Sequence, residues 1–161
     1  MFGEAEAKDA EAVLVNWEKL KSDERKADNK GVLSGVPPSM PALLRAGRLT
    51  EKAARVGFDW QNTEDVFAKL EEETSELREA MASGNQDHVH DELGDLLFTI
   101  ANIARKLGVN AEEALQSTNR KFTRRFESME RTVHQSGRNI DQLTLPEMDS
   151  LWNEAKSAER S

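Results

Sequence analysis

The sequence predicts an all-α protein with a single domain, and three of its features lead to that prediction. Its 161 residues are enough for one domain with a real core rather than for two. The 4 prolines and 9 glycines are few, and strand-like runs of β-branched or aromatic residues are nearly absent. Apolar residues instead recur at helical spacing. We expect a four-helix core with peripheral helices at the N- and C-terminal ends.

The first 38 residues are expected to form a peripheral helix and a linker. Residues 4–26 are mostly polar, with a thin apolar stripe that can dock one helix: Val13, Leu14, Trp17 and Leu20. Two glycines and the Pro37-Pro38 pair interrupt any helix between residues 28 and 39. We therefore divide the chain into residues 1–38 and a main domain over residues 39–161.

Ser39 is expected to cap the first helix of the main domain. Pro41 is compatible with the first turn of that helix, which should run to Gly57. Residues 58–60 then form a short connection that carries two aromatic side chains. The second helix should begin at residue 62 or 63 and end at residue 82.

A short turn, residues 83–85, joins the second helix to a third over residues 86–107. Helices joined by so short a turn should pack antiparallel. The stretch from residue 93 to residue 104 is apolar enough for a fully packed core helix.

Two more helices complete the main domain. Asn110 with Glu113 resembles a capping box at the start of a long helix that ends near Gln135. Its apolar stripe comprises Leu115, Thr118, Phe122, Phe126, Met129 and Val133. Thr144 and Glu147 cap a short terminal helix.

Acidic residues interrupt the apolar face of the second helix. With about 100° of rotation per residue, Glu73 falls near the middle of that face, among Val66, Leu70, Leu77 and Ala80. Glu76 flanks the face roughly 60° away, with Lys69 close to it, and Glu72 lies farther round the helix. An unpaired buried carboxylate costs several kcal/mol. We therefore expect a cation to meet Glu73, and a divalent metal is the simplest candidate.

Glu92 and Asp95 form a second acidic pair on the third helix. Residues i and i+3 share a helix face with Cβ atoms about 5–6 Å apart, so this pair and the pair Glu73 and Glu76 can each converge. Antiparallel packing can bring the two pairs together. Four carboxylates without a soft ligand suit Mg²⁺ or Mn²⁺ better than zinc or iron. Other acidic residues are expected only to face solvent: Glu71, Glu79 and Glu113.

The segment TNRKFTRRF, residues 118–126, combines basic and polar residues with an apolar stripe. Asn119 falls inside the stripe, Arg125 flanks it, and Lys121 lies one step beyond. Cations beside a polar residue suit a metal-bound polyphosphate. Asn102 similarly interrupts the third helix. The alternatives are amides satisfied within the core and a solvated basic face that includes Arg124.

The histidines and two aromatic residues are less informative. His88 and His90 lie in a polar helix start without the Glu-x-x-His pattern of di-iron bundles, and His134 is isolated. We expect all three to be surface residues. Phe58 and Trp60 could stack on a nucleobase or plug the end of the bundle, and the sequence favours neither.

The composition excludes several classes of function. A net charge of −8 argues against a nucleic-acid surface, which needs a basic patch, so an anionic substrate would be reached through local cations or bound metal. The absence of cysteine excludes disulfides, zinc–thiolate sites and thiol nucleophiles. No apolar run of about 18 residues and no signal-peptide pattern is present, so we expect a cytoplasmic protein without a membrane partner.

The acidic motif resembles the signature of the MazG-type, all-α nucleoside triphosphate pyrophosphohydrolases. It reads Glu72-Glu73-x-x-Glu76, then fifteen residues, then Glu92-x-x-Asp95. The similarity covers about residues 36–155 and includes GFDW, GDLLF, NIARKLG and NRKFTRRF. It implies a MazG-like catalytic domain over residues 39–161 that assembles into a homodimer or a higher homo-oligomer. The chain resembles the second, C-terminal domain of the two-domain bacterial members.

The resemblance also implies roles for individual residues. Metal ligands for Mg²⁺, with Mn²⁺ as an alternative, would be Glu73, Glu76, Glu92 and Asp95. Glu72 would orient a metal-bound water and act in catalysis together with Glu73. Substrate contacts would come from Lys69, Lys121 and Arg125 to the phosphates, from Asn119, and from Trp60 stacked on the base.

The implied reaction is Mg²⁺-dependent hydrolysis of a nucleoside triphosphate to the monophosphate and pyrophosphate, with two metals acting on the α-phosphate and on the attacking water. Rivals within the superfamily are dUTP- or dCTP-selective pyrophosphatases and phosphoribosyl-ATP pyrophosphohydrolase. A non-catalytic helical dimerisation module with a structural cation is the alternative from another class. A di-iron bundle is disfavoured because the Glu-x-x-His pattern is missing.

Overall fold

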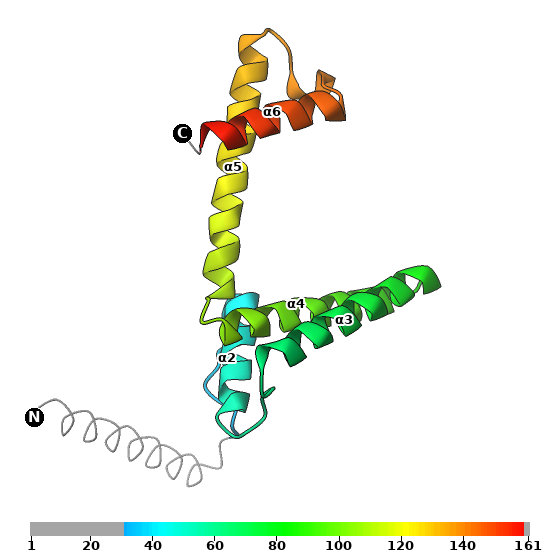
Figure 1. Ribbon diagram of the computed structural model, residues 1–161, viewed down its shortest axis with the longest axis vertical. Helices are drawn as coiled ribbons and strands as arrows, with labels where there is room; N and C mark the ends of the chain where they lie inside the picture. Colours follow the sequence, from blue (N-terminus) through cyan, green and yellow to red (C-terminus); the bar gives the residue numbers. More distant parts are fainter. Residues whose placement is uncertain (1–30, 160–161) are drawn as a thin grey trace, which may run out of the picture.

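The computed structural model describes residues 31–159, and their regular structure is entirely helical (Figure 1). In chain order the elements are α2 (Ala42–Ala54), α3 (Thr63–Ser83), α4 (Gln86–Lys106), α5 (Ala111–Gln135), the short 3₁₀ helix η1 (Ile140–Gln142) and α6 (Leu145–Ala158). The predicted all-α fold class is confirmed. The helix expected over residues 4–26 lies outside the described residues.

Asparagine side chains begin three of these helices. Asn62 Oδ1 accepts a hydrogen bond from the backbone N–H of Asp65 at 3.0 Å, and Asn85 and Asn110 cap α4 and α5 in the same way. Each cap satisfies N–H groups of the first turn that lack a partner within the helix. Gly84 ends α3 with a φ of 70°, a left-handed conformation that lets the chain reverse into α4. The predicted bounds of α3, α4 and α5 are confirmed to within a residue.

The start of α2 differs from the prediction. We predict a cap at Ser39, whereas α2 begins at Ala42 with Pro41 in the cap position and without a side-chain cap. The N–H of Met40 donates to the carbonyl of Pro37 at 3.2 Å, which holds this segment in a turn. The predicted Ser39 cap is therefore wrong, because the turn set by the proline pair extends past that residue.

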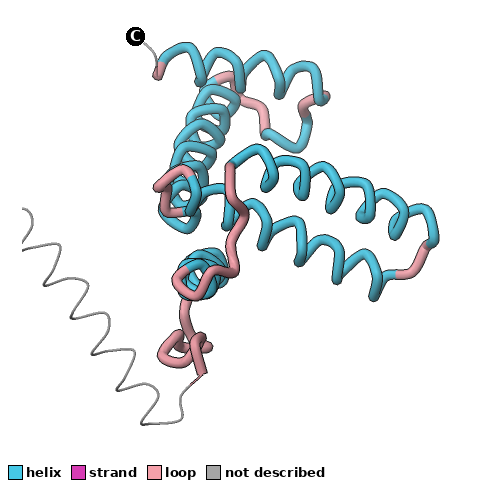
Figure 2. Tube along the Cα trace, turned by 60° about the horizontal axis from the view of Figure 1, so that its bottom comes forward, coloured by secondary structure: helices cyan, strands magenta, loops and turns pink. Residues whose placement is uncertain are grey.

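Helices α3 and α4 form an antiparallel hairpin that is the most extensively packed pair among the described helices. Val66 and Ala80 of α3 and Ala101 of α4 are almost fully buried. Helix α2 packs on α4 and α5 at the end of the hairpin remote from its turn (Figure 2), and α6 folds back on α5. No helix within residues 31–159 combines the length and apolarity needed to cross a bilayer.

The helices form two arms that diverge from their junction at α2 (Figures 1 and 2). The hairpin arm consists of α3 and α4, and the α5 arm consists of α5, η1 and α6. We predict a fully packed helix over residues 93–104, whereas many large apolar residues of both arms are 42–56% exposed: Leu93, Leu97, Phe98, Ile100, Leu115 and Phe122. That packing prediction is wrong for a single chain, because the α5 arm does not cover the hairpin.

Candidate functional site

Glu73 is the one charged residue of the described chain that is buried, with 4% exposure. It lies on the face of α3 that also carries the buried Val66 and Ala80. Its Oε1 is 2.7 Å from Nζ of Lys69, one turn earlier on α3, whereas its buried Oε2 has no hydrogen-bond partner. Burying a carboxylate oxygen without a partner costs free energy. A cation in addition to Lys69 would therefore stabilise the unpartnered Oε2 of Glu73.

Glu92 and Asp95 of α4 converge on this buried carboxylate. One carboxylate oxygen from each of Glu73, Glu92 and Asp95 lies within 4.8 Å of the others. The tight turn between α3 and α4 produces this geometry, because it sets the middle of α3 against the first half of α4. Clustered carboxylates with one unpartnered oxygen and no soft donor fit a hard divalent cation such as Mg²⁺ or Mn²⁺. The structure thus brings together three of the four predicted ligands.

Glu76, the fourth predicted ligand, is half-buried on α3 and is not one of the three converging residues. Loss of hydration, and then the negative charge of Glu92, raises the pKa of Glu76 above its usual range. The carboxylate of Glu76 therefore experiences the negative field of the other acids. A cation bound nearby would remove that repulsion.

Two positively charged or ionisable side chains flank the acidic cluster. Lys69 Nζ lies 3.0 Å from Glu72 Oε1, and its hydrogen bonds to Glu73 and then to Glu72 raise the pKa of Lys69 above its usual range. On α4, Nε2 of His88 lies 2.9 Å from Oε1 of Glu92. We predict His88 as a surface residue; its side chain is half exposed, yet it contacts a candidate ligand. The i, i+4 spacing of His88 and Glu92 is the sequence signal for this pair.

The connection before α3 is tied to the end of α4 by ion pairs. Asp59 Oδ1 accepts a hydrogen bond from Arg105 Nη2 at 2.6 Å, and Asp59 Oδ2 lies 3.0 Å from Lys106 Nζ. Against the opposing effect of burial, Arg105 and then Lys106 lower the pKa of Asp59. Lys106 also donates to the carbonyl of Trp60. These contacts fix the backbone of the segment that carries Trp60, whose side chain is 37% exposed.

Asn102 extends this network into the core. Its Oδ1 accepts a hydrogen bond from Arg105 Nε at 2.8 Å, while its buried Nδ2 has no partner. One alternative was an amide whose hydrogen bonds are satisfied within the core. This holds for the Oδ1 of Asn102 but not for its Nδ2. Phe58 is 79% exposed, so it does not plug the end of the helices within one chain.

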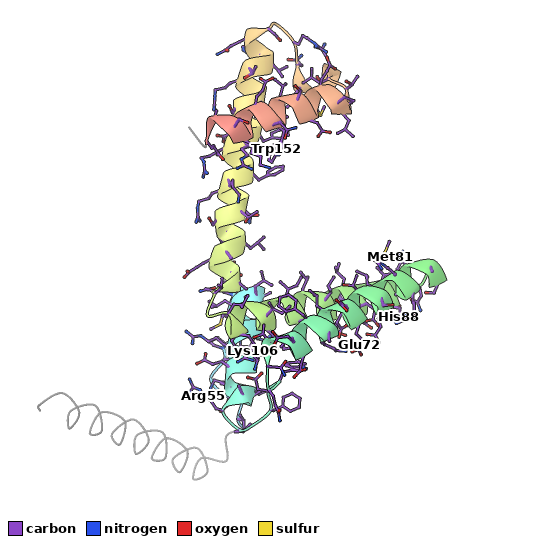
Figure 3. The ribbon with its side chains drawn as sticks, in the orientation of Figure 1. Arg55, Glu72, Met81, His88, Lys106 and Trp152 are labelled. Carbon is purple, nitrogen blue, oxygen red and sulfur yellow. The ribbon has the colours of Figure 1, made fainter. Side chains whose placement is uncertain are left out.

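The predicted substrate-binding residues of α5 lie on the other arm. Asn119 and Lys121 are exposed, and Arg125 pairs with Glu159 of the segment after α6 at 2.8 Å. We predict Asn119 within a packed stripe. This is wrong for residues 31–159 of a single chain, since no helix among them covers that part of α5. Figure 3 shows Glu72 on the hairpin arm, far from the α5 arm. One chain therefore does not bring Asn119, Lys121 and Arg125 to its own carboxylates.

Trp152 of α6 has no predicted role, yet it lies beside the basic segment of α5 (Figure 3). The guanidinium carbon of Arg125 is 5.6 Å from the centroid of the Trp152 ring, within cation–π range. The centroid of the Phe122 ring lies 5.3 Å from the centroid of the Trp152 ring. These residues are far apart along the chain, so only the folding back of α6 on α5 reveals the group.

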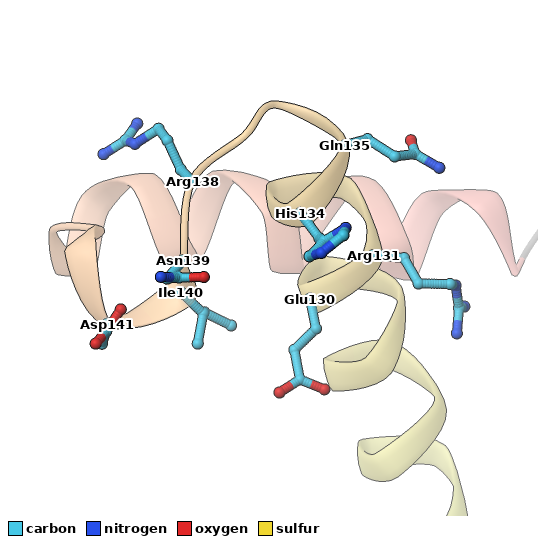
Figure 4. Close-up of a pocket in the computed structure, with 8 residues that line it drawn as sticks. All are labelled: Glu130, Arg131, His134, Gln135, Arg138, Asn139, Ile140 and Asp141. Carbon is cyan, nitrogen blue, oxygen red and sulfur yellow. The ribbon is translucent and has the colours of Figure 1, made fainter.

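A hollow of about 610 Å³ lies where α5 meets η1 (Figure 4). The residues around it are nearly all exposed and carry charges of both signs, including Glu130, Arg131, Arg138 and Asp141. None of the predicted site residues lines it. The hollow therefore has no part in the acidic site.

The fold and the site together define a class of protein: a helical protein whose hairpin presents clustered carboxylates suited to a hard divalent cation. Residues 61–129 match the MazG nucleotide pyrophosphohydrolase domain. This segment begins just before α3, ends within α5, and contains all the predicted metal ligands and the basic residues of segment 118–126. The chain therefore carries a MazG domain within residues 61–129.

Similar proteins support this assignment. The chain is 37% identical over 145 residues to the nucleoside triphosphate pyrophosphohydrolase/pyrophosphatase MazG of Thermotoga maritima, covering 90% of this chain and 56% of that protein. It is 39% identical over 165 residues to a nucleoside triphosphate pyrophosphohydrolase of Escherichia coli K12, covering 99% and 62%. It is 40% identical over 161 residues to the uncharacterised protein YabN of Bacillus subtilis, covering 99% and 33%. The chain thus spans less than two thirds of the length of these curated relatives.

Proposed function

We propose that this protein hydrolyses nucleoside triphosphates to nucleoside monophosphates and pyrophosphate, using a bound divalent cation. The observation that carries the proposal is the convergence of Glu73, Glu92 and Asp95, where Glu73 is buried and its Oε2 has no hydrogen-bond partner. Two of the relatives are named nucleoside triphosphate pyrophosphohydrolases. The carboxylates argue for the cation, and the family relationship argues for the reaction.

We assign the cation to Glu73, Glu76, Glu92 and Asp95, with Mg²⁺ as the first choice and Mn²⁺ as the alternative. All of these ligands are hard carboxylate oxygens, which prefer such cations over zinc or iron. When bound, the cation supplies positive charge that offsets the triphosphate and polarises the reacting groups. It would also relieve the repulsion that raises the pKa of Glu76.

Glu72 is the proposed base. Its side chain is 56% exposed beside the cluster and is held by Lys69 at 3.0 Å. In the proposed reaction Glu72 orients a water and accepts its proton while the water oxygen bonds to the α-phosphorus. The bond from that phosphorus to the bridging oxygen breaks, and its electron pair leaves with pyrophosphate. Lys69 remains cationic at neutral pH, because Glu73 and Glu72 raise its pKa, so it can offset phosphate charge.

The remaining assignments concern the substrate. Lys121 and Arg125 would bind the phosphates and Asn119 would hold the substrate. Trp60 would stack on the base, and its backbone is already fixed by Lys106. The chain as a whole carries a net charge of −8, which favours free nucleotides over nucleic acid as ligands.

We further propose that the protein is a homodimer of the cytoplasm. Large apolar side chains such as Phe98 and Ile100 on α4, and Phe122 on α5, are 42–56% exposed in a single chain. Exposed apolar surface shared by several neighbouring residues is typical of an interaction surface. A second copy would bury these side chains and complete a larger helical bundle.

The activity is tested by incubating the protein with a panel of nucleotides, with and without Mg²⁺, and separating the products by anion-exchange chromatography. We expect monophosphate and pyrophosphate only when Mg²⁺ is present. Glu73→Gln should abolish turnover, whereas the matched control Glu79→Gln, on an exposed position of the same helix, should not. Formation of diphosphate and orthophosphate, or no turnover at all, would overturn the proposal. Turnover confined to dUTP, dCTP or phosphoribosyl-ATP would identify one of the narrower activities.

A further inference from the structure

Arg125 differs from the other basic residues of segment 118–126 in being largely enclosed. Its side chain is 14% exposed, whereas Arg120, Lys121 and Arg124 are exposed. A guanidinium keeps its charge at any physiological pH, so its enclosure requires partners that offset the lost hydration. Those partners come from α6, which folds back on α5 (Figure 1).

Glu159, the C-cap residue of α6, holds one edge of this guanidinium. Nε of Arg125 donates a hydrogen bond to Oε2 of Glu159 at 2.8 Å, and Nη2 of Arg125 lies 2.8 Å from the same oxygen. The other carboxylate oxygen, Oε1, lies 3.3 Å from Nη2 of Arg124. The hydrogen bond from Arg125 is the largest cause of the lowered pKa of Glu159, so this carboxylate is ionised at neutral pH.

Aromatic rings restrain the same guanidinium from another side. Its carbon Cζ lies 5.6 Å from the centroid of the Trp152 ring, within cation–π range. Trp152 in turn packs against Phe122, and the ring of Phe122 stacks on that of Phe126 with centroids 5.9 Å apart (Figure 3). A guanidinium held by a carboxylate and by a packed ring has little freedom to rotate.

The opposite edge of Arg125 remains available to a ligand. The contacts of this guanidinium with Glu159 involve Nε and Nη2, and Nη1 makes no hydrogen bond or ion pair within residues 31–159. A guanidinium carries five N–H donors in a rigid plane, and an anionic group such as phosphate accepts a pair of them. An arginine whose orientation is fixed beforehand loses less conformational freedom when that anion binds.

We propose that Glu159 is a positioning residue for Arg125: it fixes the guanidinium so that the Nη1 edge is presented to the phosphates of the nucleotide. Glu159 acts through Arg125 and does not itself touch the substrate. This inference rests on the proposed function, which assigns Arg125 to the phosphates. The opposing hypothesis is competition, in which the Glu159 carboxylate occupies the place of a phosphate and has to leave before the substrate binds.

Two substitutions of Glu159 in the full-length chain separate positioning from competition. Glutamine keeps one carbonyl oxygen that can accept from both Nε and Nη2 but carries no charge, whereas alanine removes the acceptor and the charge together. Binding is measured by calorimetry with Mg²⁺ and an α,β-methylene nucleoside triphosphate. Its methylene group replaces the bridging oxygen of the bond that the proposed reaction breaks, so the ligand is not turned over.

Positioning predicts that glutamine rescues the binding that alanine loses. We expect Glu159→Ala to weaken binding about tenfold and Glu159→Gln to remain within about twofold of the wild type, since removing a partner that orients a binding group costs at least about tenfold. Glu154→Ala, at an exposed position of the same helix, is the matched control and should bind like the wild type. Tighter binding by both Glu159 variants would show competition instead, and wild-type binding by Glu159→Ala would also overturn the proposal.

The orientation of Arg125 can be followed without any nucleotide. A fixed, hydrogen-bonded Nε–H exchanges slowly with water and gives its own peak in proton–nitrogen NMR spectra, assigned here by its loss in Arg125→Lys. We expect this peak in the wild type and in Glu159→Gln but not in Glu159→Ala, and its persistence in Glu159→Ala would contradict positioning.

Failure of this proposal is distinguishable from failure of the proposed function. If the wild type does not bind the triphosphate analogue, the proposed function fails and Arg125 has no phosphate to be positioned for. If the wild type binds the analogue but the affinity does not depend on Glu159, the role of Glu159 alone is wrong.

Discussion

Replacing Glu73 by glutamine should leave the metal-free protein nearly as stable as the wild type. At an effective dielectric constant of about 20, two unit charges at the 4.8 Å upper limit of the cluster repel by about 3.5 kcal/mol, and a 2.7 Å ion pair attracts by about 6 kcal/mol. The substitution relieves two such repulsions, with Glu92 and Asp95, and loses one attraction, with Lys69. The opposing contributions nearly cancel, so we expect a change within about 1 kcal/mol.

The response to Mg²⁺ should change much more. At a concentration a hundredfold above Kd, a ligand that binds only the folded state stabilises it by about 2.7 kcal/mol. For a chain of 161 residues this raises the unfolding temperature by about 5–11 °C. Glu73→Gln removes the buried ligand and should lose most of this shift.

Thermal unfolding followed by circular dichroism, in EDTA and in Mg²⁺, measures both effects. Glu79→Gln is the matched control and should keep the full Mg²⁺ shift. The reasoning would be refuted if Glu73→Gln kept a wild-type Mg²⁺ shift. It would also be refuted if the metal-free variant melted far below the wild type, since that would make the Lys69 pair the dominant interaction.

Three further predictions concern other parts of the chain. The N–H of Thr144, followed by Arg138, lowers the pKa of Glu147 from 4.5 to about 2. The ionised Glu147 carboxylate therefore stabilises the fold fully above pH 4.5, and this stabilisation is lost as the pH falls towards 2. The free energy of unfolding of Glu147→Gln, measured in urea, should therefore approach that of the wild type in acid. Asp59→Asn should cost about 1 kcal/mol, measured by urea unfolding at pH 7. Phe98→Glu should give monomers in sedimentation velocity; an unchanged dimer would place the interface elsewhere.

The helices and the acidic site were largely predictable because their signals are local. The caps at Asn62, Asn85 and Asn110 act within one turn, and helical periodicity alone places Glu73 on the buried face of α3. A short turn between α3 and α4 then limits which residues of the two helices can meet. Ser39 shows the limit of this approach. The proline pair indicates a turn, but how far that turn extends depends on the backbone hydrogen bond from Met40 to Pro37, which residue type does not specify.

The rest of the site depends on how distant segments are arranged. Periodicity marks Leu97 and Phe122 as apolar-face residues, but it cannot say whether the chain itself or a second copy covers them. Whether Lys121 meets the carboxylates depends on the direction in which α5 leaves the junction. The contact of Arg125 with Trp152 depends on the return of α6 along α5. None of these directions is encoded in the spacing of residues within one helix.

The ion pairs around Asp59 matter for the carboxylates at the middle of the hairpin. The turn at Gly84 joins α3 to α4 at one end, and Asp59 with Arg105 and Lys106 ties the start of α3 to the end of α4 at the other. A hairpin fastened at both ends cannot splay when the acids at its centre repel one another. The proposed ligands are thus preorganised: the metal-free protein already holds their repulsion in place, and binding of the proposed cation would relieve it without moving either helix.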